Sequence, residues 1–353
     1  MRINNREDNV IRHRNAAALA FAAVLGLTLS KASAQTPWYD LPAVKALYEK
    51  AKEEKEVVIW GPVQNEVDWI EPQFSKRFPG ITIKGTGDLQ AATKLIAEAR
   101  ANRHSVDVWQ NSLGGMIEVQ KRGLFAKVDW RPYGVTPGNI LFDGEGIAVH
   151  NFVYSTLYSK AFVKEADLPK TWDDLLDPKW RGKMVAQDFL FPRLMGFLAV
   201  KWGEERTEKW GRAMINDQKL LITNAPRESF LKTGERILAV ADSVNQAYQY
   251  TDNGVPTGYT ILDIVPAVQF MISPMKNAPH PNAARLLALW QASDEGMAAR
   301  EKTVYGFSIR PGSKSHVAAE VEKAKAAVIL EDVATMEQRA NFYKKFSGII
   351  RGQ

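Results

Sequence analysis

The sequence has 353 residues, with 46 Lys and Arg against 40 Asp and Glu, and it contains no cysteine. The lack of cysteine excludes disulfides, thiolate metal sites and cysteine nucleophiles. Residues 1–34 carry half of the formal net charge of +6, and the remainder of the chain has no basic cluster beyond ordinary solvated faces, which argues against a nucleic-acid partner.

The first 34 residues predict an export signal. Four arginines precede an apolar run over residues 16–29, and Ala32-Ser33-Ala34 follows it. A basic start, a short apolar run and a small-x-small cleavage site are typical of a secretory signal peptide. The apolar run is too short for a membrane anchor, which needs roughly 20 residues. We therefore expect residues 1–34 to be removed and a periplasmic product to begin near Gln35.

The chain after the signal first alternates between predicted strands and helices. Short apolar runs predict buried strands at 56–60, 81–84 and 106–109. Apolar residues at helical spacing predict helices over 67–78, 89–99 and 112–119, and residues 85–88 form a predicted turn. Strands that alternate with helices through short connections predict an α/β fold with a doubly wound parallel sheet.

The second half predicts another α/β unit. A β segment at 147–158 leads into a stretch rich in Lys, Asp and Pro at 164–177, where a domain boundary is expected. Beyond it, the patterns predict strands at 183–186, 237–241 and 261–272, and helices at 193–202, 206–216, 282–292 and 315–346. We expect one lobe from 35–160 plus 263–312, a second from 161–262, and C-terminal helices at 313–353 that pack on the lobes. The alternative is one continuous domain.

The most specific string is Thr-Trp-Asp-Asp-Leu-Leu-Asp-Pro-Lys-Trp-Arg-Gly-Lys-Met-Val at 171–185. It resembles the extracellular solute-binding proteins of ABC importers, in the branch that includes ferric-ion, thiamine, phosphonate and sugar-phosphate binders. Further matching strings follow in the family's order, at 57–60, 106–109, 121–125, 234–235 and 272–279. The resemblance implies a type II periplasmic binding protein fold, in which two α/β lobes are joined by crossover segments and the ligand lies in the cleft between them. It also implies an inner-membrane ABC permease as partner, and a monomer is expected.

The predicted ligand site lies where strands meet helices. In open parallel sheets, ligands bind outside the carboxyl ends of the strands, where helix N-termini offer unpaired N–H groups. The chain has four such places, each of which also fits an ordinary turn or cap. They contain Gly61 and Gln64, then Gly87, then Asn111 and Ser112, and finally Asp242 and Ser243.

Other side chains complete the predicted site. Arg193 and Arg227 suit bidentate binding of a carboxylate or phosphate, although each also fits a surface charge. Trp60 and Tyr248 suit stacking on a planar ligand, although Trp60 also fits core packing. With Asn224, these residues predict capture of a small organic anion, a carboxylate or a phosphorylated or phosphonate compound, without a metal or cofactor.

A ferric ion is the alternative ligand. Iron-binding members of the family are expected to use an imidazole and a carboxylate from the first lobe and two adjacent tyrosines from the second. Here Val63-Gln64-Asn65 follows the first strand without a histidine. Tyr248 and Tyr250 are separated by one residue, so on a helix they point about 200° apart. This pattern disfavours a shared iron atom.

A secreted hydrolase is the alternative of a different class. The sequence has no Gly-x-Ser-x-Gly elbow, no His-Glu-x-x-His and no Gly-x-x-x-x-Gly-Lys loop. Paired acids such as Asp173-Asp174 diverge when they are adjacent on a helix, which argues against paired-acid catalysis. We therefore expect a binding protein and not an enzyme, with a hinge that closes when the ligand contacts both lobes.

Overall fold

The computed structural model describes residues 36–351, so the predicted signal peptide lies outside the described residues. Within this range, no helix is both long and apolar enough to cross a membrane. The strands are β1 (Glu56–Gly61), β2 (Thr82–Gly87), β3 (Val108–Ser112), β4 (Ile140–Leu141), β5 (Gly146–Ser159), β6 (Met184–Ala186), β7 (Leu221–Ile222), β8 (Leu238–Ser243), β9 (Thr257–Thr260), β10 (Ile264–Pro274) and β11 (Ala327–Leu330).

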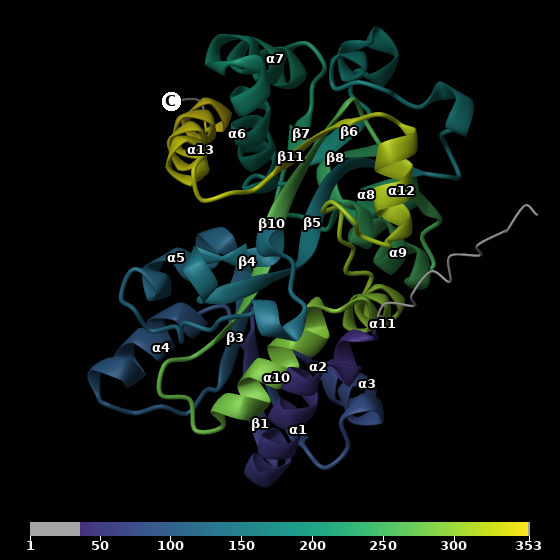
Figure 1. Ribbon diagram of the computed structural model, residues 1–353. Coiled ribbons are helices and arrows are strands. Elements are labelled where there is room, and N and C mark those ends of the chain that lie inside the picture. The colour runs from purple at the N-terminus through teal and green to yellow at the C-terminus, as the bar shows by residue number, and fades with distance from the viewer. Residues whose placement is uncertain (1–35, 352–353) are drawn as a thin grey trace, which may run out of the picture. The chain divides into compact units, whose positions relative to one another are not determined.

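The helices alternate with these strands over most of the chain (Figure 1). They are α1 (Pro42–Glu54), α2 (Asn65–Asp68), α3 (Ile70–Arg77), α4 (Ala91–Arg100), α5 (Leu113–Gln120), α6 (Leu190–Trp202), α7 (Glu204–Asn216), α8 (Arg227–Thr233), α9 (Val244–Asp252), α10 (Pro281–Ala292), α11 (Asp294–Val304), α12 (His316–Lys323) and α13 (Met336–Ile350).

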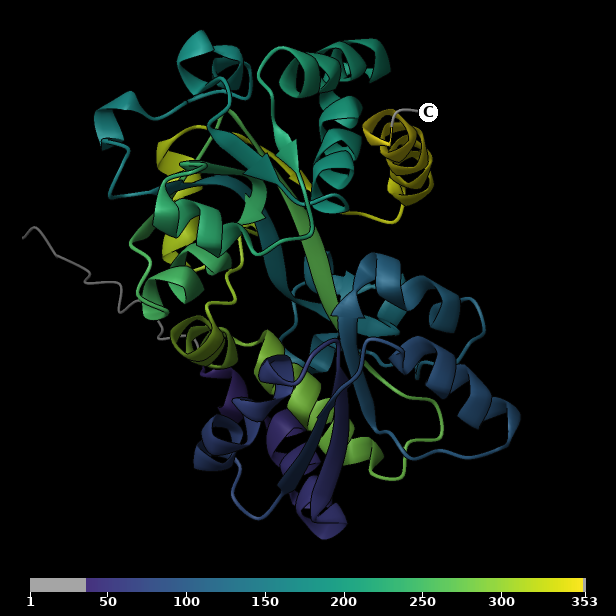
Figure 2. The same ribbon diagram turned by 180° about the vertical axis from the view of Figure 1, so that it is seen from behind.

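Two long strands connect the two α/β lobes. In the first lobe, β1 pairs in parallel with β2 and β3, and β3 pairs antiparallel with β10. In the second lobe, β8 pairs in parallel with β6, which pairs in parallel with β7. The crossover strands β5 and β10 pair with each other in antiparallel register, and β5 continues to β8 (Figures 1 and 2). The register of β5 and β10 shifts between Gln269 and Met271, which marks an irregularity within the crossover.

Each lobe has apolar cores of its own. In the first lobe, α1, α3 and α10 pack on one set of side chains of β1, including Val57 and Ile59, while α4 and α5 pack with Trp60 and Trp109. In the second lobe, α6, α7 and α13 share one core, and α8 and α9 share another with Leu157. Alternate strand residues face opposite sides of a sheet, so each sheet is covered by helices on both faces.

The structure departs from the sequence patterns at three elements. The helix predicted over 67–78 is divided at Trp69 into α2 and α3. The turn predicted at 85–88 is largely strand, because Gly85 to Gly87 pair with the end of β1. The helix predicted over 315–346 is interrupted by β11, whose apolar residues pair in parallel with the start of β10. In each case long-range pairing or packing overrides the local pattern.

Candidate functional site

The predicted site residues of the first lobe hold two strand ends together. The Gln64 side-chain oxygen accepts a hydrogen bond from the Gly87 backbone N–H at 2.8 Å, and Gln64 Nε2 donates to Asp68 at 2.6 Å. A Cβ atom on Gly87 would lie 2.0 Å from the backbone nitrogen of Gln64, and one on Gly61 would lie 2.7 Å from Val67. Both glycines are therefore required by close packing of the loops after β1 and β2.

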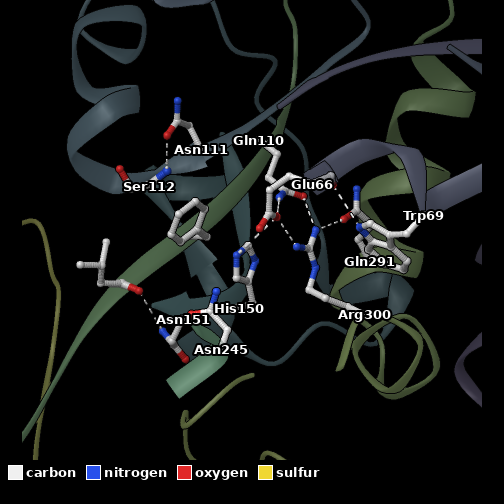
Figure 3. Close-up of polar contacts among 12 residues, drawn as sticks. Glu66, Trp69, Gln110, Asn111, Ser112, His150, Asn151, Asn245, Gln291 and Arg300 are labelled. Carbon is white, nitrogen blue, oxygen red and sulfur yellow. Dashed lines mark hydrogen bonds and ion pairs between the residues drawn. The ribbon is translucent and has the colours of Figure 1, made fainter. Parts of the chain in front are cut away.

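Asn111 and Ser112 form the N-terminal end of α5 (Figure 3). The Asn111 side-chain oxygen accepts from the Ser112 backbone N–H at 2.7 Å, and Ser112 Oγ accepts from the Gly115 N–H at 3.3 Å. The serine is thus an N-cap, which satisfies one of the unpaired donors of the helix. The helix start, with its partial positive charge, lies at the carboxyl end of β3.

In the second lobe, Arg227 and Asp242 form a buried ion pair. Arg227 Nε donates to Asp242 Oδ2 at 2.5 Å, and its Nη1 donates to the side chain of Gln187 at 2.8 Å. The carboxylate of Asp242 also accepts from the Ser243 backbone N–H at 2.9 Å. Asp242 and Ser243 have no exposed surface. This pair fixes the start of α9, where Ser243 is the N-cap residue.

The remaining predicted residues are placed separately. Asn224 is exposed and donates to Asp188 at 2.8 Å, while Trp60 packs half-buried in the core beneath α4 and α5. The Tyr248 hydroxyl lies 2.7 Å from His316 Nε2, and its ring stacks on Tyr305 at 5.0 Å. Tyr248 is therefore engaged by other protein side chains. No hydrogen bond or ion pair within residues 36–351 joins the predicted residues of the first lobe to those of the second.

The first lobe contains a buried polar network whose residues were not predicted as site residues (Figure 3). The Arg300 side chain, which is 0 % exposed, donates to Glu66 at 2.5 Å and to Gln110 and Gln291 at 2.9 Å each. The face of the Arg300 guanidinium also lies 4.8 Å from the ring of Trp69. Glu66 belongs to α2 and Gln110 to β3, so the network joins two of the strand ends expected to face the ligand.

His150 borders this network. Its ring stacks on Phe270 with centroids 4.3 Å apart, and its Nε2 lies 3.7 Å from Glu66 Oε2 (Figure 3). Burial and then the nearby Arg300 charge hold the pKa of His150 well below its ordinary value of 6.5. The imidazole is therefore neutral in the folded protein, and it does not compete with Arg300 for the Glu66 carboxylate.

Stability should depend on pH through His150. The unfolded chain takes up a proton near pH 6.5 and the folded His150 does not, so the free energy of unfolding falls as pH drops below that value. From pH 7.5 to pH 5.5 this residue alone accounts for a loss on the order of 1 kcal/mol. We expect His150→Gln to show a smaller loss than the wild type in urea unfolding at the two pH values.

The control for this experiment is His104→Gln, which changes a histidine outside the network. An equal loss in His150→Gln and in the wild type would contradict the assignment of a neutral, buried His150.

The described residues offer little to a bare metal ion. Within residues 36–351, no group of three or more His, Asp or Glu side chains is arranged to hold one. The one carboxylate of the network, Glu66, is already bound by a fully buried guanidinium. The arrangement instead presents helix N-termini and polar side chains, which are suited to bind an anion.

Comparisons with known proteins agree with this architecture. The family model of bacterial extracellular solute-binding proteins matches residues 116–252. An Fe(3+)-binding periplasmic protein of Serratia marcescens is 28% identical over 151 residues, which are 41% of this chain and 44% of that protein. The sequence match therefore spans less than half of that relative.

Solved structures match over more of the chain. Iron-bound HitA from Pseudomonas aeruginosa has a TM-score of 0.65 at 18% identity, over 83% of this chain and 99% of that one. An ABC transporter substrate-binding protein from Bradyrhizobium japonicum has a TM-score of 0.66 at 16% identity, over 83% and 98%. Trichodesmium IdiA in complex with iron and citrate has a TM-score of 0.63 at 15% identity, over 83% and 99%.

Two lobes of helix-covered sheet, connected by β5 and β10, define a type II periplasmic binding protein fold, and the structural neighbours share it. The sequence resemblance centred on residues 171–185 is confirmed, because these residues lie inside the matched family model. Over residues 116–252 the chain is similar to bacterial extracellular solute-binding proteins.

Proposed function

We propose that this protein is the periplasmic receptor of an ABC importer and that it captures a small organic anion. The observation that carries the proposal is the pair of helix starts at α5 and α9, which follow the carboxyl ends of β3 and β8 in different lobes. Helix N-termini favour negative charge. A bound anion gives up water molecules, and hydrogen bonds from the N–H groups replace them.

The proposed mechanism is closure about the crossover strands. A ligand that contacts both lobes stabilises the closed form by its differential affinity, and the permease recognises that form. Asn111 and Ser112 act from the first lobe, and Asp242 and Ser243 from the second. Since Asp242 and Ser243 are fully buried, their part is to hold the start of α9 in place. No covalent step is required of the protein, so it is not proposed to be an enzyme.

A direct test changes both helix starts together. We expect Ser112→Ala combined with Ser243→Ala to weaken ligand binding at least tenfold, because α5 loses its side-chain cap and the first turn of α9 loses the Ser243 hydroxyl that bonds the Asn245 side chain. Isothermal titration calorimetry with a ligand found by a thermal-shift screen of organic acids and phosphorylated metabolites measures the effect.

The matched control is Ser105→Ala with Ser229→Ala, which changes one exposed serine in each lobe. This control should bind as the wild type does. Equal affinity of the two double variants would refute the assigned role of the helix starts.

Ferric iron is the second candidate, and it is favoured by the likeness to the Fe(3+)-binding protein of Serratia and to iron-bound HitA of Pseudomonas. The occupied Glu66 carboxylate argues against a bare ion, whereas the Trichodesmium structure contains citrate together with iron. Citrate, ferric citrate and a ferric salt belong in the same thermal-shift screen. Stabilisation by citrate alone supports the organic anion, and stabilisation that requires iron supports the alternative.

A further inference from the structure

A cavity of about 310 Å³ lies between α5, α6 and α13. Its lining includes Gly114 at the start of α5 in the first lobe, and residues of α6 and α13, which pack against each other in the second (Figures 1 and 2). Binding sites for small molecules range from about 300 to 1,000 Å³. The cavity therefore has room for a small solute, and its lining comes from both lobes.

The cavity carries one uncompensated positive charge. Glu331 is 4% exposed and accepts hydrogen bonds from Arg339 Nη1 at 2.9 Å and from the Gln269 N–H at 3.2 Å. Arg339 thus neutralises Glu331. Arg193, which also lines the cavity, lies 3.7 Å from Glu331 and donates no hydrogen bond to any residue in the described range 36–351. Its guanidinium keeps its donors for a ligand.

The rest of the lining is largely apolar. Phe197 is fully buried beneath the Arg339 guanidinium, which lies 4.6 Å from its ring, and Met336 lines the cavity from α13. Phe189 and Tyr343 are 46% and 37% exposed, which is unusual for large aromatic side chains. Exposed aromatic surface that lines a cavity is a common mark of a ligand site.

We infer that this cavity binds a monocarboxylate with an apolar, aromatic body. The carboxylate pairs with Arg193 in a bidentate contact, and the body packs against the exposed rings of Phe189 and Tyr343. A dianion fits less well, since two guanidiniums and one carboxylate leave the cavity a net charge of only +1. This inference rests on the proposed receptor function and names the chemical class of the solute. The cavity lies at the start of α5, and no residue of α9 lines it.

The test uses calorimetry on the full chain with 3-phenylpropionate as the probe. Acetate has the carboxylate without the phenylalkyl group, and 3-phenylpropan-1-ol has the phenylalkyl group without the negative charge. We expect both to bind at least tenfold more weakly than 3-phenylpropionate. The inference is overturned if the alcohol binds as tightly as the acid.

Arg193→Met should weaken 3-phenylpropionate binding at least tenfold, because it keeps an unbranched apolar stem and removes the guanidinium. The control is Arg206→Met, which changes an arginine on α7 that pairs with Asp173. A second variant, Ala340→Trp, fills the cavity from an exposed position on α13 and should abolish binding without a change at Arg193. Unchanged affinity in both Arg193→Met and Ala340→Trp would overturn the site.

Further probes distinguish a wrong solute class from a wrong receptor function. Succinate, inorganic phosphate and ferric citrate are titrated in parallel with the wild type. If one of them binds and no arylalkanoate does, the inferred class is wrong and the receptor role stands. If none of the probes binds, the inferred class is wrong and the proposed organic-anion receptor loses its support as well.

Discussion

Glu66→Gln should lower the free energy of unfolding by about 3 to 5 kcal/mol. The substitution keeps the shape of the side chain but removes the charge that faces Arg300, whose side chain is 0 % exposed. A guanidinium that is left buried without its carboxylate is costly, because the remaining contacts to Gln110 and Gln291 are neutral. Urea unfolding followed by tryptophan fluorescence measures the change in midpoint and slope.

Asp173→Asn is the matched control for Glu66→Gln. It removes the carboxylate that pairs with Arg206, and both side chains of that pair are more than half exposed. Exposed ion pairs contribute about 0 to 1 kcal/mol, so this variant should unfold close to the wild-type midpoint. If the two variants were destabilised equally, Arg300 would not depend on Glu66 for its stability in the folded state.

Asp242→Asn should have a comparable effect in the second lobe, a loss of about 3 to 5 kcal/mol. Arg227 has an 11% exposed side chain and would keep only neutral side-chain partners, Gln187 among them. The Asn oxygen can still accept from the Ser243 N–H, so the start of α9 retains its backbone contact. The loss therefore reports the charge pair rather than the helix cap, and urea unfolding again measures it.

The corresponding control is Asp129→Asn, whose partner Arg131 is 72% exposed. A shift of the unfolding midpoint as large as that of Asp242→Asn would mean that the buried location of the Arg227–Asp242 pair is irrelevant. We expect no more than about 1 kcal/mol from this surface pair.

The order of elements could be predicted from the sequence because it depends on local periodicity. The runs at 56–60 and 237–241 and the helical pattern at 282–292 correspond to β1, β8 and α10 with ends displaced by few residues. Where prediction was wrong, as at residues 85–88, the deciding factor was pairing with a distant strand. The local pattern of Gly85 and Gly87 is typical of a turn, but their lack of a side chain lets Gln64 and Val67 pack against the sheet.

The site was harder to predict, because its contacts join residues far apart in the chain. Glu66 and Arg300 are separated by 234 positions, and no motif around either residue indicates the other. Arg227 and Asp242 were both predicted as ligand residues, and the fold instead pairs them with each other. A polar residue near a helix start looks the same in sequence whether it binds a solute or satisfies a neighbour.

The shifted register at Gln269–Met271 has a consequence for how the molecule flexes. A ladder that is interrupted at one position already lacks the regular bonds there, so rotation at that position breaks few of them. The Asn151 side chain bonds the backbone of Ile309 opposite this interruption, which restrains a third segment at the same level. We therefore expect bending to be concentrated within a few residues of this interruption, while the helix packing inside each lobe stays the same.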